Sequence, residues 1–272
     1  MMPVPSSVAI IGVILAAMAV VAWVETIVPL HARGRWNGVH LGPNLALTFI
    51  TFATNIFFNA ALVLTLTWLQ ANGVGLLRMF ALPPAVSVVI VVVALDLSFY
   101  VAHVAMHRSP GLWHFHAVHH SDPAVDVTTT IRQHPGENVI RYVFMAAAAV
   151  PLGAGPGAFE LYRVWSAVHG LLEHANVRVP RRLDTLCSLV VSTPNMHKVH
   201  HSRAATETNT NYGNLFSLFD RSFSTFTPSE RGPNIVCGLD GVDHPAAQTT
   251  AALLAMPFRE RWAPERVTAR RR

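Results

Sequence analysis

Long apolar runs dominate the first hundred residues of the chain. They extend from about Val8 to Leu30, from Leu45 to Leu69 and from Leu82 to Ala105. Each run is long enough to cross about 30 Å of hydrocarbon as a helix. The first run lacks the basic start and the small-residue cleavage site of a signal peptide. We therefore predict a membrane region over residues 1–95, with its third helix continuing into the next region.

A weaker pair of apolar segments follows, Tyr142–Leu152 and Phe159–Leu172, separated by a Gly/Pro-rich stretch at residues 153–157. Neither segment alone is long enough to be a secure span. Together they predict a helical hairpin at about 142–172, either spanning with tilt or re-entrant. The pattern as a whole predicts an all-α integral membrane bundle of about four membrane-embedded helices with a histidine-rich helical cap.

Beyond Pro180 the chain becomes polar, and residues 181–272 are expected to close over the cap as a cytoplasmic portion. The last thirty or so residues carry little signal and predict a loose tail. Arg33 and Arg35 follow the first run, whereas only Arg78 lies between the second and the third. The positive-inside rule then places the N-terminus outside and the histidine-rich face in the cytoplasm.

Composition narrows the class of protein. Hydrophobic residues make up 51% of the chain and charged residues 13%, about half the charge of a typical soluble domain. This excludes a soluble globular enzyme, a disordered protein and a collagen-like rod. The net charge of +5 comes without a basic stripe with interleaved aromatics, so nucleic acid is not an expected partner. Cys187 and Cys237 are too far apart for a thiolate metal site and predict no disulfide framework.

Histidine is as frequent as Asp and Glu together, with 15 residues of each kind, and twelve histidines lie between His103 and His201. Eight of them form three spaced clusters: His103-x-x-x-His107, His116-x-x-His119-His120 and His197-x-x-His200-His201. On a helix, positions i, i+3 and i+4 share one face, so the imidazoles of a cluster can reach a common centre. Eight ligands are too many for one ion, and we predict two adjacent metals.

The spacing excludes the familiar zinc-peptidase motifs. HExxH is absent, and three residues separate His169 from Glu173, so HxxEH is missed as well. Imidazole suits zinc, copper, iron and nickel alike. A dinuclear site with few carboxylates at a membrane face fits O2 activation on an apolar substrate. A bis-histidine haem protein and a non-catalytic metal-binding protein remain alternatives.

The motifs in their order resemble the fatty acid hydroxylase/sterol desaturase superfamily of integral-membrane diiron enzymes. The similarity runs from about Asp96 to Phe226, which we take as a catalytic domain (96–226) followed by a C-terminal tail (227–272). The residues that carry it are Asp96-x-x-x-Tyr100, the three histidine clusters, Ser121-Asp122, Arg132-x-His134-Pro135-x-Glu137, His174-Ala175-Asn176, Thr193-Pro194, Asn211-Tyr212-Gly213 and Asp220-Arg221. Val104, Phe219 and Ser224 depart from residues common in the family, and none of them removes a ligand.

The resemblance implies a ligand set. The implied metal ligands are His103, His107, His116, His119, His120, His174, His197, His200 and His201, with His169 as a possible tenth. Candidates to orient the ligand imidazoles are Asp96, Asn211 and Asp220, each of which could equally cap a helix or make a surface contact. His134 is expected to be an orienting or a structural residue rather than a ligand. His31, His40, His114 and His244 are given no role. Glu25, near the end of the first run, is either functional or snorkels to the interface.

The resemblance also implies an activity: O2-dependent hydroxylation, or desaturation, of a lipid such as a sterol or fatty acyl chain. The expected cofactor is a pair of iron ions, with zinc as a substitute in purified samples. No haem-domain extension or nucleotide fingerprint is visible in the sequence. An external donor, of ferredoxin or cytochrome type with a reductase, is therefore expected. The expected location is the plasma or inner membrane in a bacterium, or the endoplasmic reticulum in a eukaryote.

Overall fold

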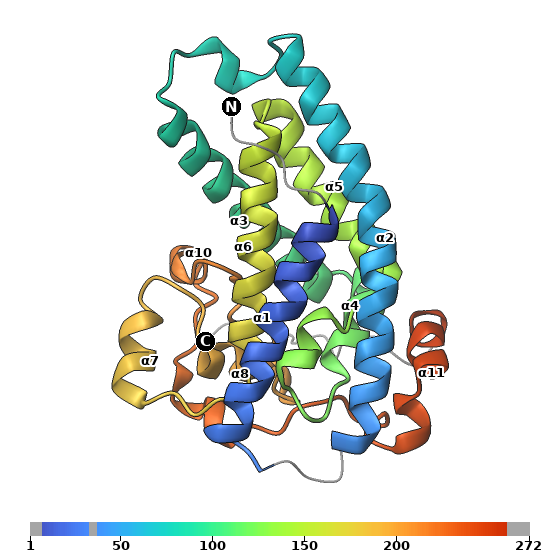
Figure 1. Ribbon diagram of the computed structural model, residues 1–272. Helices are drawn as coiled ribbons and strands as arrows, with labels where there is room; N and C mark the ends of the chain where they lie inside the picture. Colours follow the sequence, from blue (N-terminus) through green and yellow to red (C-terminus); the bar gives the residue numbers. More distant parts are fainter. Residues whose placement is uncertain (1–6, 33–36, 260–272) are drawn as a thin grey trace.

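The computed structural model describes residues 7–32 and 37–259; Arg33, Arg35 and the C-terminal arginines (residues 270–272) lie outside them. Long helices run side by side through the upper part of the molecule, and short helices and loops gather around its lower end (Figure 1). Within the described ranges there are only isolated β-bridges and no strands. The predicted all-α bundle with a helical cap is confirmed.

Three helices are long and apolar enough to cross a membrane: α1 (Ser7–Ile27), α2 (Asn37–Ala71) and α3 (Pro84–Arg108). A short helical turn, η1 (Leu76–Met79), joins α2 to α3. With 35 residues, α2 is about 52 Å long and exceeds the hydrocarbon thickness. Its first turns therefore extend into the cap, where His40 and Asn44 are buried.

The predicted hairpin consists of α5 (Pro135–Leu152) and α6 (Pro156–His174). Gly153 ends α5 in the left-handed region, with φ of 62°, and a proline starts α6. The turn packs against the link between α2 and α3, where Arg78 donates to the Gly153 carbonyl at 3.4 Å. A Cβ on Gly75 would collide with the Gly153 backbone. The hairpin thus reaches the link between α2 and α3.

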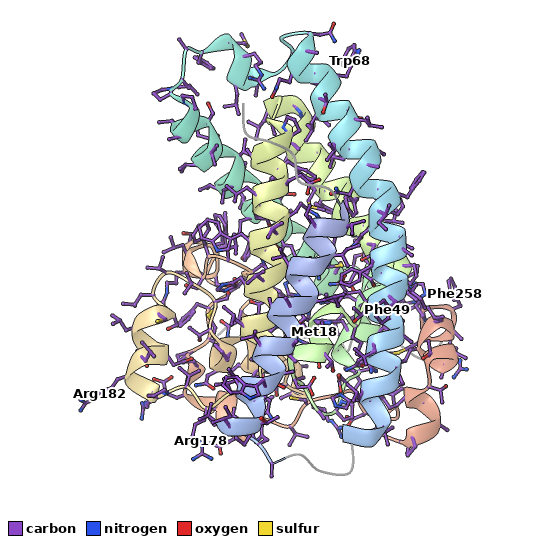
Figure 2. The ribbon with its side chains drawn as sticks, in the orientation of Figure 1. Met18, Phe49, Trp68, Arg178, Arg182 and Phe258 are labelled. Carbon is purple, nitrogen blue, oxygen red and sulfur yellow. The ribbon has the colours of Figure 1, made fainter. Side chains whose placement is uncertain are left out.

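The main core lies between α2, α3, α5 and α6, where Leu66, Leu95 and Phe159 are completely buried. α1 packs mainly against α6 and η2 (Val127–Ile131). Large apolar side chains such as Phe49 and Trp68 project outward from α2, and Arg178 and Arg182 project from the opposite end (Figure 2). An apolar outer surface with exposed arginines beyond the ends of the long helices suits a bundle surrounded by lipid.

The cap is built from short elements around the lower ends of the long helices. They are α4 (Pro110–His120), η2, α7 (Arg181–Cys187), α8 (Pro194–His200), α9 (Ala205–Thr208), α10 (Leu218–Ser222), η3 (Ser229–Asn234), η4 (Pro245–Gln248), α11 (Thr250–Ala255) and η5 (Met256–Phe258). The expected loose tail is wrong for the described residues up to 259. There, η3 packs on α8, α11 packs on α2, and Gln248 and Leu253 are completely buried.

A buried polar network fixes this C-terminal segment to the bundle. The Arg132 guanidinium is completely buried and donates to the Val118 carbonyl, Asn44 Oδ1, Ser121 Oγ and Gln248 Oε1 at 2.6–3.0 Å. Asn44 also donates to Asp122 at 2.8 Å, and His40 Nδ1 lies 3.1 Å from the same carboxyl group. His40, which had no predicted role, therefore belongs to the contacts that join α2 to the cap.

Glu25 is also a structural link between elements. Its side chain is only 1% exposed, and its Oε1 accepts hydrogen bonds from the N–H groups of Val127 and Asn176 at 2.8 Å each. Snorkelling to the interface is therefore excluded. The carboxyl group joins the end of α1 to η2 and to the segment after α6.

The Arg132→Met variant should be strongly destabilised. Methionine leaves buried acceptors on three different elements without a donor and leaves Asp122 without its positive neighbour, which costs about 3–5 kcal/mol. Thermal unfolding in detergent should show a clear drop in Tm. The matched control is Arg182→Met, because Arg182 lies on the surface, and its Tm should stay at the wild-type value. Equal Tm values for the two variants would contradict the stabilising role of this network.

Candidate metal centre

Among the described residues, nine buried histidines converge in the cap; eight lie on α3, α4, α6 and α8, and His201 directly follows α8. They form two groups, and within each group the ring nitrogens lie within 4.8 Å of one another. The first group is His103, His107, His116, His120 and His200; the second is His119, His174, His197 and His201. These are the nine residues that the sequence analysis expects as ligands. His169 lies outside both groups, with its Nε2 3.0 Å from the Ser192 carbonyl oxygen.

Helical spacing divides the second and third clusters between the two groups, whereas His103 and His107 both belong to the first group. On α4, His116 and His120 face the first group and His119 faces the second. On α8 the assignment is reversed, since His200 joins the first group and its two cluster partners join the second. Each helix starts at a proline, and the Thr193 side chain caps α8 by accepting from a backbone N–H. Two helices therefore contribute to both groups at once, which holds the groups adjacent.

Three of the ring nitrogens that face away from the centre have backbone carbonyl partners. Nδ1 of His103, His174 and His200 lie 2.7–2.8 Å from the carbonyl oxygens of Tyr212, Gly170 and Thr210. A carbonyl only accepts hydrogen bonds, so each of these Nδ1 atoms carries the proton. Each Nε2 then presents a lone pair to the centre, as a metal ligand must.

The inward-facing nitrogens are unusually close. His103 Nε2 lies 3.0 Å from His116 Nε2, and His174 Nε2 lies 3.0–3.2 Å from those of His119, His197 and His201. Lone pairs at such distances repel unless a cation lies among them. Adjacent nitrogens bound at about 2.1 Å to one metal at a right angle would be about 3.0 Å apart. The donor set therefore fits metal ions, and these distances leave no space for a porphyrin between the rings.

Burial keeps the rings neutral. It lowers the pKa of His200 to about 3, with the charge of His116 adding to the effect. Burial, followed by repulsion among the rings, also holds the pKa values of His120 and His201 well below their usual range. Histidines of this kind are available as ligands at neutral pH because no proton has to be displaced from Nε2.

Two of the residues expected to orient the imidazoles, Asp96 and Asp220, bind backbone N–H groups near the site instead of the imidazoles themselves. Asp220 accepts from the N–H groups of Tyr212 and Gly213 at 2.8 Å each, and Tyr212 in turn faces His103 through its carbonyl. Asp96 accepts from the N–H groups of residues 215 and 216 at 3.2 and 3.0 Å. Both carboxyl groups fix the loop that carries the Tyr212 carbonyl. Neither of them binds a ligand ring directly.

The other two residues of that set stabilise helix ends and loops. Asn211, with φ of 56°, donates to the Met196 carbonyl and accepts from the Thr227 N–H. His134 caps α5 by accepting from the Gly136 N–H at 2.9 Å. Among the described residues, neither side chain hydrogen-bonds to any of the nine histidines.

The sequence analysis assigned no role to Glu137 or Asn209, which do contact the histidines. Glu137 Oε1 lies 3.1 Å from His116 Nδ1 and 2.6 Å from the Arg141 guanidinium. Asn209 Oδ1 lies 3.3 Å from His107 Nδ1. Glu137 is part of a quoted motif and could have been found there, whereas nothing in the sequence around Asn209 indicates its position.

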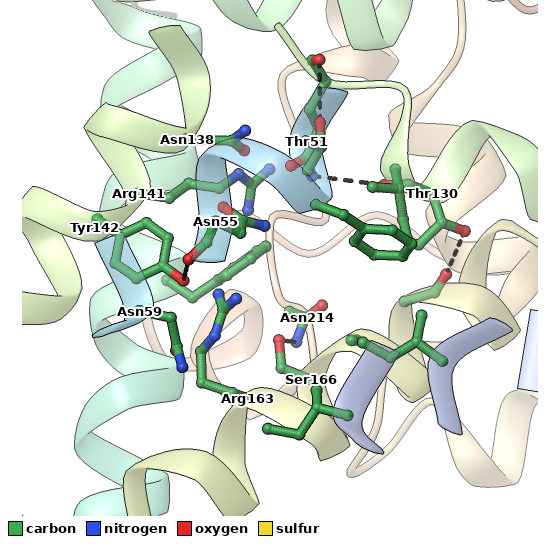
Figure 3. A pocket seen from close by; sticks show the side chains of 18 of the residues that line it. Thr51, Asn55, Asn59, Thr130, Asn138, Arg141, Tyr142, Arg163, Ser166 and Asn214 are labelled. Atoms are coloured by element: carbon green, nitrogen blue, oxygen red, sulfur yellow. Dashed lines mark hydrogen bonds between the residues drawn. The ribbon is translucent and has the colours of Figure 1, made fainter. Parts of the chain in front are cut away.

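A cavity inside the bundle opens onto both histidine groups. Its lining includes His103 from the first group and His119, His174 and His197 from the second. Polar side chains from α2, α5 and α6 point into it, among them Arg141 and Arg163, as Figure 3 shows. The opposite wall is apolar and comes from α1 and α2, for example Ile14. A substrate in this cavity would lie next to the metal centre and inside the membrane region.

Comparison with known proteins decides the family. A family model described as fatty acid hydroxylase matches residues 88–225, the segment that contains all nine histidines. The chain belongs to the fatty acid hydroxylase family. Family membership confirms the resemblance seen in the motifs, and together with the three candidate spans it makes this chain a membrane protein.

Proteins named as a lipid hydroxylase and as alkylglycerol monooxygenases are similar to this chain. An ornithine lipid hydroxylase from Rhizobium tropici is 34% identical over 176 residues, which is 65% of this chain and 51% of that protein. Alkylglycerol monooxygenases of Caenorhabditis elegans and Homo sapiens are 28% and 26% identical over 148 and 131 residues, 53% and 48% of this chain. The chain spans about half the length of the first relative and 28% of each of the other two. No solved structure matches the chain significantly.

Replacing one histidine in each group should remove metal selectively. We expect His120→Ala and His201→Ala each to lower the metal content from about two ions per chain to about one, because each loses an inward-facing donor. The double variant should hold almost none. Elemental analysis of the purified protein measures this content.

The matched controls are His114→Ala and His169→Ala, since neither residue belongs to a histidine group. Both should retain the wild-type content. Full metal content in the double variant would contradict the assignment of ligands, as would loss of metal in His114→Ala.

Proposed function

We propose that this protein is a membrane lipid hydroxylase that uses O2, two iron ions and external electrons. The observation that carries the proposal is the pair of histidine groups at the end of a cavity within the bundle. The relatives named as hydroxylase and monooxygenase of lipids support the reaction class. The nine histidines of the two groups would hold the iron, and zinc would occupy the same nitrogens in samples purified without iron.

The reaction balances as hydroxylation. A C–H bond of the lipid breaks and a C–O bond forms, one oxygen atom of O2 enters the product, and the other leaves as water with two protons. Two electrons come from a separate donor of ferredoxin or cytochrome type. Iron supplies the O2 and redox chemistry when bound; desaturation of the lipid would use the same centre.

The chain's own residues position the reactants. The apolar wall from α1 and α2 excludes water from the lipid chain. His103, His119, His174 and His197 are the histidines nearest to a lipid in the cavity, since they line it. The carbonyl partners described above hold the rings in one orientation, so that Nε2 stays directed at the centre. Enclosure of this kind protects a strong oxidant from side reactions.

Oxygen from O2 should appear in a lipid product. Membranes that contain the wild-type protein, a donor system and ¹⁸O2 should yield a lipid with one ¹⁸O atom, detected by mass spectrometry. His200→Ala should lower product formation by at least about 100-fold, because an inward-facing donor is lost. His114→Ala serves as the control and should keep full activity. Normal product formation by His200→Ala would refute the proposal.

The proposed topology places the N-terminus outside, the histidine cap in the cytoplasm and the link between α2 and α3 outside. Cysteines introduced as Asn72→Cys and Asp240→Cys, in a Cys187→Ser/Cys237→Ser background, report the two sides. A membrane-impermeant maleimide should label Asn72→Cys in intact cells and Asp240→Cys only after permeabilisation. Both positions are exposed: Asn72 directly follows α2, at the end of that helix away from the cap, and Asp240 lies in the cap between η3 and η4. The reverse labelling pattern would overturn the orientation.

A further inference from the structure

Charged side chains inside the cavity stand out in so apolar a bundle. Glu160 and Arg163 lie on α6, and Asn59 faces them from α2; all three line the cavity. Polar and ionisable side chains at membrane depth are unfavourable and are retained mainly for function. They lie well above the histidines, since Arg163 is eleven residues before His174 on α6, about 16 Å of helix rise.

The two charged groups are not in direct contact as an ion pair. Glu160 and Arg163 are one helical turn apart, yet no ion pair joins them within the described residues. Glu160 Oε1 instead accepts from Asn59 Nδ2 at 2.5 Å, and the Arg163 guanidinium lies 4.9 Å from the centroid of the Tyr142 ring. The structure thus keeps an anionic and a cationic group separate on one wall of the cavity.

Each of these three side chains has a buried polar atom that makes no hydrogen bond within the described residues. Glu160 Oε2, Arg163 Nε and Asn59 Oδ1 are buried and have no hydrogen-bond partner among the described residues. Buried polar atoms in folded proteins almost always have partners. Three orphaned atoms around one cavity therefore indicate a ligand that supplies both a donor and an acceptor.

The neighbouring arginine differs in this respect. Arg141 also lines the cavity, but its guanidinium lies 2.6 Å from Glu137, which in turn faces His116. The positive charge of Arg141 is therefore already paired with the Glu137 carboxylate. Arg163 is the arginine left to meet an anionic group on the substrate.

We propose that Glu160 and Arg163 bind the zwitterionic headgroup of the substrate lipid, Glu160 contacting its ammonium group and Arg163 its anionic oxygens. This inference rests on the proposed lipid hydroxylase function and adds the substrate class. The headgroup is held on the polar wall, and the lipid chain lies against the apolar side chains of α1 and α2, such as Ile11 and Phe52. The distance from this anchor to the histidines then determines which carbon is oxidised.

Two lipid sources share this headgroup chemistry. A lipid with an amino acid headgroup carries an ammonium and a carboxylate, and phosphatidylethanolamine carries an ammonium and a phosphate. The similarity to an ornithine lipid hydroxylase and the planar fork of one guanidinium both suit a carboxylate. Neutral alkylglycerols and free fatty acids lack one or both charges, and they serve as the discriminating substrates.

The test compares kcat/KM for ornithine lipid, phosphatidylethanolamine, an alkylglycerol and a free fatty acid, with the metal-loaded protein and its electron donor. Arg163→Leu and Glu160→Gln should each raise KM for the preferred zwitterionic lipid at least 10-fold. The same variants should change KM for the alkylglycerol less than 2-fold. Arg163→Lys should restore part of the loss. Arg181→Leu and Glu230→Gln, an exposed ion pair on the cap, are the matched controls and should leave every substrate unaffected.

Binding without turnover separates this inference from the proposed function. Native mass spectrometry of the metal-loaded protein without its electron donor should show retention of the zwitterionic lipid by the wild type and by Arg181→Leu, and its loss in Arg163→Leu and Glu160→Gln. If the wild type oxidises no lipid but this pattern is seen, the proposed function fails and the headgroup site stands. A wild-type preference for a neutral or purely anionic lipid would contradict the proposed headgroup site. So would an equal loss of kcat/KM on all four substrates in the variants, or unchanged retention of the zwitterionic lipid by both of them.

Discussion

The need to hold many neutral imidazoles close together governs this structure. Nine rings are buried in one cap, and their inward nitrogens approach to 3.0–3.2 Å in several pairs. Such a cluster is unfavourable by itself, because unprotonated nitrogens repel and burial prevents them from taking up protons. Metal ions convert this repulsion into ligation. The stability of the cap and the chemistry of the centre are therefore expected to depend on the same atoms.

Two sets of contacts hold the imidazoles and the cap around them in place. Carbonyl groups of the segment 210–212 hold His103 and His200 from behind, and Asp220 fixes that segment in turn. On the opposite side, the buried Arg132 network joins α2, the residues after α4 and the C-terminal helices. Because the first turns of α2 take part in that network, one helix connects the membrane region directly to the histidine-rich cap.

Much of this architecture could be predicted from the sequence, because its signals are local. Apolar run lengths predicted the three long helices, glycine and proline predicted the hairpin turn, and histidine spacing together with the family motifs indicated the nine converging rings. The assignment of His119 and His200 to opposite groups from their cluster partners could not be predicted. It depends on how α4 and α8 face each other, which no local pattern encodes. Contacts such as His40 with Asp122 join residues 82 positions apart and are likewise invisible to spacing.

The central claim is that the two histidine groups hold two separate metal ions. Anomalous diffraction from crystals of the iron-loaded protein, recorded at the iron edge, tests it most directly. The account predicts two peaks per chain, one bounded by the His103 group and the other by the His119 group. A single peak shared between the groups, or peaks at histidines outside both, would contradict the account.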